Sequence, residues 1–350
     1  MYHGEGDWGA SLAHPVLNRS CLGWWAVALA LAAGLVAAWA AAGSPAAAHA
    51  AARHTPTYRL TSYTKVGQDR SFKCDIAADL HTPPQLVVFG GSRATRFRPS
   101  TIHDVSGLTA LNAAVQNFRP EDGWAITRFL HRRAPGVKLH VLFAVQATTF
   151  SDARLHAGLL YDRRLSRWFP DRLIARQRRL LGTLVHPNIL RVKRYSSRGL
   201  LLWNSYDQRR EDGVLLSRIL ERYIRYQLPT AGNTARVKQA RSHLYFEKTI
   251  AFCNRHGVIP LVVIMPYHPK VLEAFRAVGW EVKVDRLRAY LAGLQTRCDL
   301  RVVDLLDIAM FGGDPDEFYD GAHVTAENCD RIIRHVVTVA PECFQETPSP

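Results

Sequence analysis

Five short apolar runs constrain the fold of this 350-residue chain more than any other feature. None of them alternates apolar with polar residues, so each predicts a strand that is covered on both faces, as in a parallel sheet. The runs are LVVFG (86–90), TALNAAV (109–115), KLHVLFAV (138–145), VIPLVVIMP (258–266) and LRVVDL (300–305).

Helical patterns separate these runs. One pattern begins at Pro120-Glu121-Asp122, where a proline and two acids suit a first helical turn. Others cover about 236–256, 281–297 and 325–339. The alternation predicts a doubly wound α/β fold with a mainly parallel five-stranded sheet, of the flavodoxin-like kind.

A segment of about 151–235 interrupts this alternation and predicts a helical insertion without a strong strand. Its residues 154–198 contain twelve Lys/Arg and two Asp, and Trp168 and Phe169 lie among them. A helical pattern follows near 214–228. The insertion either lies on a membrane surface, as basic and aromatic residues together favour, or covers the sheet with a solvated face.

The net charge of +15 favours an anionic partner, although a composition rich in arginine would give the same excess. No zinc-ligand spacing, RNP-like aromatic strand or helix-turn-helix pattern accompanies the basic residues. Nucleic acid is therefore not the expected partner.

The apolar segment 21–42 is long enough to span a bilayer as a helix. It predicts either an uncleaved membrane anchor or a secretory signal cleaved near residues 48–50, which read Ala-His-Ala. The first reading gives a membrane-anchored protein with an extracytoplasmic domain, and the second a secreted one. Arg53, Arg59 and Lys65 beyond the segment argue against export, so the topology stays open.

These features divide the chain as follows. Residues 1–20 form an N-terminal tail, 43–70 a linker, 71–342 the α/β domain and 343–350 a disordered tail.

Six cysteines are present, and none belongs to a C-x-x-C motif. If the domain is exported, Cys253 with Cys298 and Cys329 with Cys343 are candidate disulfides. The alternative is that these side chains are buried thiols.

Ser92 follows the first predicted strand on a Gly90-Gly91 turn, where sites form in open α/β sheets. A serine nucleophile needs a general base that a carboxylate orients. Asp320 and His323, in FYDGAHVTA (318–326), are three residues apart and can lie on one side of a tight turn. Together the three side chains predict a Ser–His–Asp triad.

The sequence resembles the SGNH (GDSL-like) hydrolase superfamily, in particular its membrane-anchored envelope branch, over most of residues 84–340. The stretches that carry the resemblance are VVFGGSRATRF, LNAAVQNFRPED, VVIMPYHP and FGGDPDEFYDGAHVTAENCDRII. The resemblance implies Ser92 as nucleophile, Asp320 and His323 as its partners, and acyl-ester hydrolysis or acyl transfer without a cofactor or a metal.

Two positions depart from the family pattern at the oxyanion hole. Asn117 stands where the second block has a glycine, and asparagine tolerates the left-handed backbone region better than other non-glycine residues. The third block has no asparagine, so Gln146 or Thr148 would have to replace it. Gly91 and the Ser92 amide complete the predicted oxyanion set.

Three further residues are candidates for substrate binding. Arg93 and Arg96 could hold an anionic group of the substrate, or could be exposed or locally paired. His268 could line the pocket, replace His323 as base, or cap a loop.

The sequence therefore predicts a serine-dependent acyl hydrolase or O-acyltransferase of the cell envelope. Its substrate would be an acylated small molecule or an envelope glycan. The alternatives are an inactive protein of the same fold that binds polymer or partner proteins, and a binder of membrane or nucleic acid that works through 154–198.

Overall fold

The five apolar runs form one sheet, in which every neighbouring pair of strands is parallel and the order is β3-β2-β4-β7-β8. Its strands are β2 (Leu86–Gly90), β3 (Ala110–Asn112), β4 (His140–Val145), β7 (Leu261–Ile264) and β8 (Arg301–Asp304). This confirms the predicted α/β fold with a mainly parallel five-stranded sheet. All side chains of β2, β3, β4 and β7 are buried, which is why these runs contain so few polar residues.

The computed structural model describes residues 58–62, 68–181, 191–233 and 238–345. The segment 21–42, the candidate cleavage site at 48–50 and Cys21 lie outside these ranges, so the predicted membrane anchor stays a prediction. Within the ranges, no helix combines the length and the apolar character that a membrane crossing requires.

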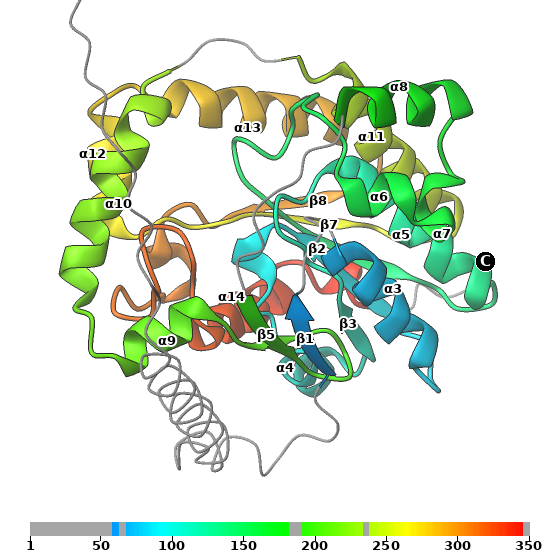
Figure 1. Cartoon of the computed structure of the whole chain (residues 1–350), viewed down its shortest axis with the longest axis horizontal. Coiled ribbons are helices and arrows are strands. Elements are labelled where there is room, and N and C mark those ends of the chain that lie inside the picture. The colour runs from blue at the N-terminus through cyan, green and yellow to red at the C-terminus, as the bar shows by residue number, and fades with distance from the viewer. Residues whose placement is uncertain (1–57, 63–67, 182–190, 234–237, 346–350) are drawn as a thin grey trace, which may run out of the picture. The chain divides into compact units, whose positions relative to one another are not determined.

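Helices cover both faces of the sheet (Figure 1). Because consecutive side chains of a strand point to opposite faces, β2 contributes Val87 and Phe89 to one apolar cluster and Leu86 and Val88 to another. The first cluster joins the sheet to α3 (Gln68–Asp79), α5 (Pro120–Arg133), α11 (Ala240–Arg255) and α13 (Glu281–Gln295). The second joins it to α4 (Pro99–Ser106) and α14 (Ala326–Val339).

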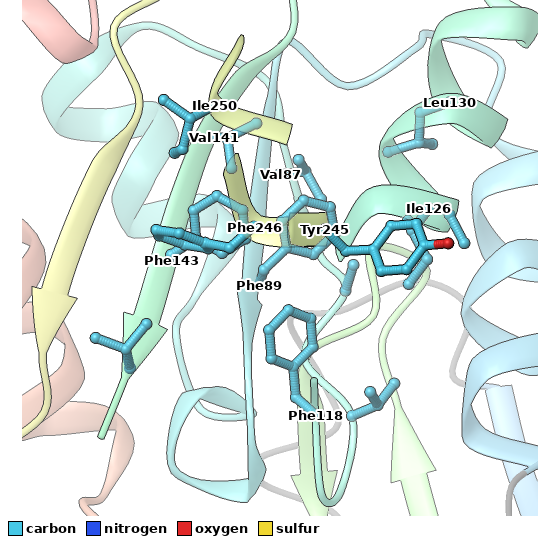
Figure 2. Close-up of a cluster of buried hydrophobic side chains, with 14 of the residues drawn as sticks. Val87, Phe89, Phe118, Ile126, Leu130, Val141, Phe143, Tyr245, Phe246 and Ile250 are labelled. Carbon is cyan, nitrogen blue, oxygen red and sulfur yellow. The ribbon is translucent and has the colours of Figure 1, made fainter. Parts of the chain in front are cut away.

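Aromatic rings fill the centre of the first cluster (Figure 2). Phe89, Phe118 and Phe143 lie with ring centroids 5.4 to 6.4 Å apart, and Phe246 contacts Phe143 edge-on at 4.9 Å. Rings at these separations and angles attract one another beyond the area that they bury. This packing fixes the loop after β3, which carries Phe118, against the strand that leads to Ser92.

The insertion differs from the prediction, because it contains two strands. β5 (Arg191–Tyr195) and β6 (Leu201–Trp203) pair antiparallel, and β1 (Tyr58–Ser62), from the predicted linker, pairs with β5 (Figure 1). β5 reads RVKRY, and its charged residues hid the strand pattern. The helices of this region are α6 (Ala157–Tyr161), α7 (Arg163–Ser166), α8 (Asp171–Leu181), α9 (Ser205–Glu211) and α10 (Leu216–Ala231).

The small sheet is attached to the main sheet through backbone and lysine hydrogen bonds. The Leu201 amide donates to the carbonyl of Thr95 at 3.0 Å, just after the Ser92 turn. Lys73 in α3 donates to the carbonyl of Asn112 at 2.7 Å and to that of Gly199. Burial lowers the pKa of Lys73 to about 7. The insertion therefore lies against the carboxyl end of β2.

Two boundaries differ from those predicted. α3 begins at Gln68 inside the predicted linker, and it buries Arg70 and Lys73, which read as surface residues in the sequence. At the other end, Cys343 and Phe344 pack against the second cluster, although the predicted disordered tail begins at 343. The short helix η3 (Pro341–Cys343) turns these two side chains inward.

The cysteines of the described residues are free thiols, so neither candidate disulfide forms. Burial raises the pKa of Cys253 and of Cys343 to about 12, and that of Cys329 well above its usual value. Protonated, buried thiols behave as small apolar side chains. The alternative of buried thiols is the one that the structure supports.

His156 predicts an acid-sensitive stability. Burial, with help from the nearby Arg70 guanidinium, lowers the pKa of this imidazole from 6.5 to about 4. Between these values the unfolded chain binds a proton that the folded chain does not, so the free energy of unfolding falls as the pH drops from about 6.5 to about 4. The full loss is about 3 kcal/mol.

Urea unfolding at about pH 7 and about pH 4.5 checks this expectation in wild type and in His156→Gln. The variant should lose less stability between the two pH values than the wild type. Equal losses of unfolding free energy in wild type and variant would show that His156 does not contribute to the acid sensitivity.

Candidate active site

The turn after β2 places Ser92 at the carboxyl edge of the sheet. Ser92 opens the short helix η1 (Ser92–Ala94), and Gly91 precedes it in extended conformation. A Cβ atom on Gly90 would lie 2.7 Å from Ala94 Cβ and 2.9 Å from the Ala144 carbonyl oxygen. Only glycine at 90 lets the chain turn this closely against β4, and the turn lifts the Ser92 hydroxyl out of the sheet.

The structure brings Ser92, His323 and Asp320 together in one line of hydrogen bonds. Ser92 Oγ lies 2.7 Å from His323 Nε2. His323 Nδ1 lies 2.8 Å from Asp320 Oδ2 and 2.9 Å from Asp320 Oδ1. The three side chains thus have the contacts that a nucleophile, a base and an orienting carboxylate require.

Asp320 stays ionised because its surroundings favour the charged form. Burial raises the pKa of this carboxyl, but His323 and the amides of Ala322 and His323 outweigh that effect and hold the pKa below its ordinary value. Both amides donate to Asp320 Oδ1, at 2.8 and 2.9 Å. The carboxylate is therefore fixed in place by the same turn that carries the histidine.

That turn is closed by backbone hydrogen bonds on either side. The Tyr319 amide donates to the His323 carbonyl at 2.7 Å, and Phe318 pairs with Val324 as an isolated bridge. α14 starts directly afterwards, so the last helix anchors His323 above the sheet.

Two cavities meet at Ser92 and Asn117. The smaller, of about 320 Å³, has a wall that includes all the predicted oxyanion residues, namely Gly91, Ser92, Asn117, Gln146 and Thr148. The larger, of about 560 Å³, also contains His323, together with the rim segment Trp203-Asn204-Ser205-Tyr206. An ester at Ser92 can thus extend in two directions.

Two backbone amides at this junction are available to an oxyanion. Neither the Ser92 amide nor the Asn117 amide donates a hydrogen bond to any residue that the structure describes. Both residues border the smaller cavity. The backbone amide of Gln146, in contrast, donates to Thr149 Oγ1 at 2.9 Å. Gln146 itself belongs to the wall of the smaller cavity.

Asn117 adopts the left-handed backbone conformation that a glycine would favour, with φ of 53°. The left-handed turn that asparagine was expected to tolerate is therefore present, and a role of Asn117 at the oxyanion stays a prediction. The same turn is held by Arg70 from α3, whose Nη1 and Nη2 donate to the carbonyls of Gln116 and Asn117 at 3.3 and 3.2 Å.

Arg70 also forms a buried, bidentate ion pair with Asp122 at 2.6 and 2.7 Å. Asp122 accepts a further bond from the Arg119 amide at 2.9 Å, at the start of α5. Neither Arg70 nor Asp122 was expected to contribute to the site. A single guanidinium therefore fixes both the Asn117 turn and the helix that follows it.

Arg93 is buried and stacks on the ring of Tyr267, with its Cζ 3.8 Å from the ring centroid. Burial lowers the pKa of this guanidinium, but the neighbouring Tyr267 and Tyr223 hydroxyls outweigh that effect and raise it. Arg93 borders the smaller cavity, and its Nη1 has no hydrogen-bond partner among the described residues.

Arg96 is paired with neighbouring residues, as the alternative to a role in substrate binding predicted. It forms an ion pair with Asp207 in α9 and donates to the carbonyls of Leu201 and Leu202, both at 2.9 Å. Asp207 Oδ1 also accepts the Tyr319 hydroxyl at 2.9 Å. Arg96 thereby links the nucleophile turn, the insertion and the turn that bears His323, and it does not face a cavity at Ser92.

Tyr206 is a contributor whose role the sequence did not reveal. Its ring lies 4.7 Å from the His323 ring, tilted by 34°, and its hydroxyl is 3.4 Å from His323 Nε2. The WNSYD segment was interpreted either as a rim or as packing. The capping box of α9, in which Asn204 and Asp207 cap each other's backbone amides, is the sequence signal that places Tyr206.

His268 caps a helix. Its Nδ1 accepts the Lys270 amide at 3.2 Å at the start of α12 (Pro269–Arg276), and its own amide donates to the Gly321 carbonyl at 3.1 Å. It is absent from the walls of the two cavities that meet at Ser92, as far as the described ranges show. The alternative of a capping histidine is therefore the one that the structure supports.

In the part of the chain that the structure describes, no three His, Cys, Asp or Glu side chains are placed to hold a metal ion.

Comparison with solved structures finds distant structural likenesses. No protein-family model matches the chain, and no curated protein matches it. Among solved structures, a proposed acylhydrolase from Bacteroides fragilis matches with a TM-score of 0.37 and 12% sequence identity. The match covers 79% of this chain and 97% of that one. A TM-score this low assigns neither a family nor an activity.

The Arg70–Asp122 pair predicts a large loss of stability when one partner alone is removed. Arg70→Met leaves the Asp122 carboxylate buried without its cation, so the free energy of unfolding should fall by about 3–5 kcal/mol. Arg70→Met/Asp122→Leu should recover much of that loss, because no buried charge remains. Urea unfolding of both variants measures the difference, and a double variant as unstable as the single one would contradict this account.

Asn117 predicts a smaller effect that depends on backbone conformation. Asn117→Ala should destabilise the protein by about 1 kcal/mol, because alanine resists a positive φ, whereas Asn117→Gly should stay within about 0.5 kcal/mol of wild type. Gln116→Ala, at the exposed neighbouring position, is the control. Equal unfolding free energies for the alanine and glycine variants at 117 would argue against a left-handed turn.

Proposed function

We propose that this protein is a serine-dependent acyl-ester hydrolase or O-acyltransferase of the SGNH type. One observation carries the proposal: the line of hydrogen bonds from Ser92 Oγ through His323 to Asp320. The serine end of this line lies beside the amides of Ser92 and Asn117 and at the junction of the two cavities. A serine with only a structural role would not need a histidine oriented by an ionised carboxylate.

In the first half of the reaction, Ser92 Oγ attacks the acyl carbonyl while His323 Nε2 takes the hydroxyl proton. Asp320 accepts a hydrogen bond from Nδ1, which directs the free electron pair of Nε2 toward Ser92 and stabilises the imidazolium. The amides of Ser92 and Asn117 donate to the oxyanion. When the tetrahedral adduct collapses, the leaving alcohol takes the proton from Nε2.

In the second half, water or an acceptor hydroxyl attacks the acyl group on Ser92, with His323 again taking the proton. Water gives hydrolysis, and a sugar or other alcohol gives transfer. Tyr206, with its hydroxyl 3.4 Å from Nε2, lies where the entering or leaving oxygen must pass.

The hydrogen-bond donors of the proposed oxyanion site are mainly backbone amides and not side chains. A missing side-chain donor lowers transition-state stabilisation by about 3 kcal/mol. Gln146 borders the smaller cavity, and its side-chain amide is the donor that we propose in its place. The enzyme would otherwise be slow.

We further propose that the protein acts at the cell envelope on an acylated small molecule or glycan, held at the membrane by residues 21–42 or secreted after cleavage. The apolar composition of that segment supports the first arrangement. The alternative function is an inactive protein of this fold that binds polymer or partner proteins. The departures at Asn117 and Gln146 favour that alternative, and the intact triad geometry argues against it.

A fluorescent phosphonate that labels activated serines distinguishes the two functions. The purified chain should be labelled, and Ser92→Ala and His323→Ala should not, because the first lacks the nucleophile and the second its base. Ser217→Ala, which removes an exposed hydroxyl in α10, is the matched control and should be labelled like wild type.

Circular dichroism confirms that each variant is folded. A folded wild type that takes no label would favour the binding protein, and persistent labelling of Ser92→Ala would place the reactive serine elsewhere.

A further inference from the structure

Cationic side chains outnumber acidic ones around the two cavities that meet at Ser92. Among the described residues that line either cavity, Asp69, in the wall of the larger one, is the one carboxylate. The lysine and arginine residues in these walls are Arg93, Arg119, Lys193 and Arg209. A cavity lined mostly by one sign of charge favours a ligand of the opposite sign.

Three of these cations already have partners inside the protein. Lys193 pairs with Asp69 at 2.9 Å. Arg93 is buried against Tyr267, and Arg119 donates to the carbonyl and hydroxyl of Ser151 at 2.9 and 3.1 Å. These contacts account for Lys193 and Arg119 without a ligand, whereas Nη1 of the buried Arg93, a residue of the smaller cavity's wall, has no hydrogen-bond partner among the described residues.

Arg209 is different. It is exposed on α9 and borders the larger cavity, and no carboxylate in the described part of the chain pairs with it. Its guanidinium lies 5.9 Å from the centroid of the Tyr206 ring. Arg194, also exposed and without an acidic partner among described residues, lies 5.6 Å from the ring of Trp203. Arg194 is not part of the described wall of the larger cavity, but Trp203 is, so two guanidinium groups without carboxylate partners lie near aromatic residues of the same rim.

The reaction at Ser92 determines whether the alcohol half or the acyl half of an ester lies against this rim. The leaving oxygen must accept a proton from His323 Nε2, so the alcohol half lies on the side of His323 and Tyr206. Both residues border the larger cavity. The carbonyl oxygen lies toward the amides of Ser92 and Asn117, which border both cavities, and the smaller cavity, whose wall lacks His323 and Tyr206, is left for the acyl group.

We propose that the alcohol half of the substrate carries an anionic oxygen group, a carboxylate or a phosphate, and that Arg209 and Arg194 recognise it. This inference rests on the proposed ester chemistry and narrows it to acidic substrates. It also gives the basic insertion a function, because β5 and α9 bring these two residues to the rim.

Two esters of nearly equal shape test the inference on the full chain. 4-Acetoxybenzoate and 4-acetoxybenzamide share the acyl group and differ in one charge. Wild type should show a higher kcat/KM for the carboxylate, normalised to uncatalysed hydrolysis. Arg209→Gln should lower the preference by about three- to fivefold, with a similar loss in Arg194→Gln, as for exposed ion pairs.

Arg176→Gln, on the exposed face of α8, removes the same charge away from both cavities and should leave the preference unchanged. Raising the salt from about 0.05 M to about 0.5 M should weaken the preference in wild type. 4-Acetoxyphenyl phosphate forms a third arm: a larger preference for it would support the inference and identify the group as phosphate.

The outcomes separate this inference from the proposed function. Hydrolysis of both esters without preference would overturn the inference and leave the ester chemistry intact. An equal loss in Arg176→Gln and Arg209→Gln would also overturn it, because the effect would then come from the overall charge. Hydrolysis of none of the esters, with no phosphonate labelling, would overturn both.

Discussion

The buried guanidinium of Arg70 is the interaction on which the candidate site depends. A charge removed from water is tolerable only when a partner charge and further acceptors satisfy it. Arg70 has the Asp122 carboxylate and the carbonyls of Gln116 and Asn117. Since these acceptors lie in the loop after β3 and in the first turn of α5, the need to satisfy the guanidinium also determines the shape of the oxyanion side of the site.

A second cation, Arg96, connects the two bodies of structure that build the site. The α/β sheet supplies Ser92 and the insertion supplies Tyr206, and Arg96 contacts β6 and Asp207 from the turn that follows Ser92. Asp207 in turn receives the Tyr319 hydroxyl beside the triad carboxylate. The insertion is therefore part of the site's construction, and the position of Tyr206 against His323 depends on this link.

The elements that could be predicted from sequence are those that only apolar burial determines. β2, β4 and β7 are hydrophobic on both faces, and the Gly90-Gly91 turn with the Asp320–His323 spacing identified the three residues that the structure brings together. α3 and β5 were missed because many of their residues are charged, and residues such as Arg70 and Lys193 find their carboxylate partners only in the fold. A buried Arg70 reads like a surface arginine until its carboxylate, 52 residues away, is known. The roles of Arg96 and Tyr206 depend on contacts of the same long-range kind.

Ser92 and His323 are 231 residues apart, and the histidine stands directly before the last long helix. During synthesis the serine is made long before its base, so a growing chain carries an unactivated hydroxyl until α14 docks on the sheet. The loop closure that this contact requires is among the longest that the chain can make, and such contacts form late in folding. Under the proposed function, Ser92 is activated only when α14 brings His323 to it, so activity requires the completed fold.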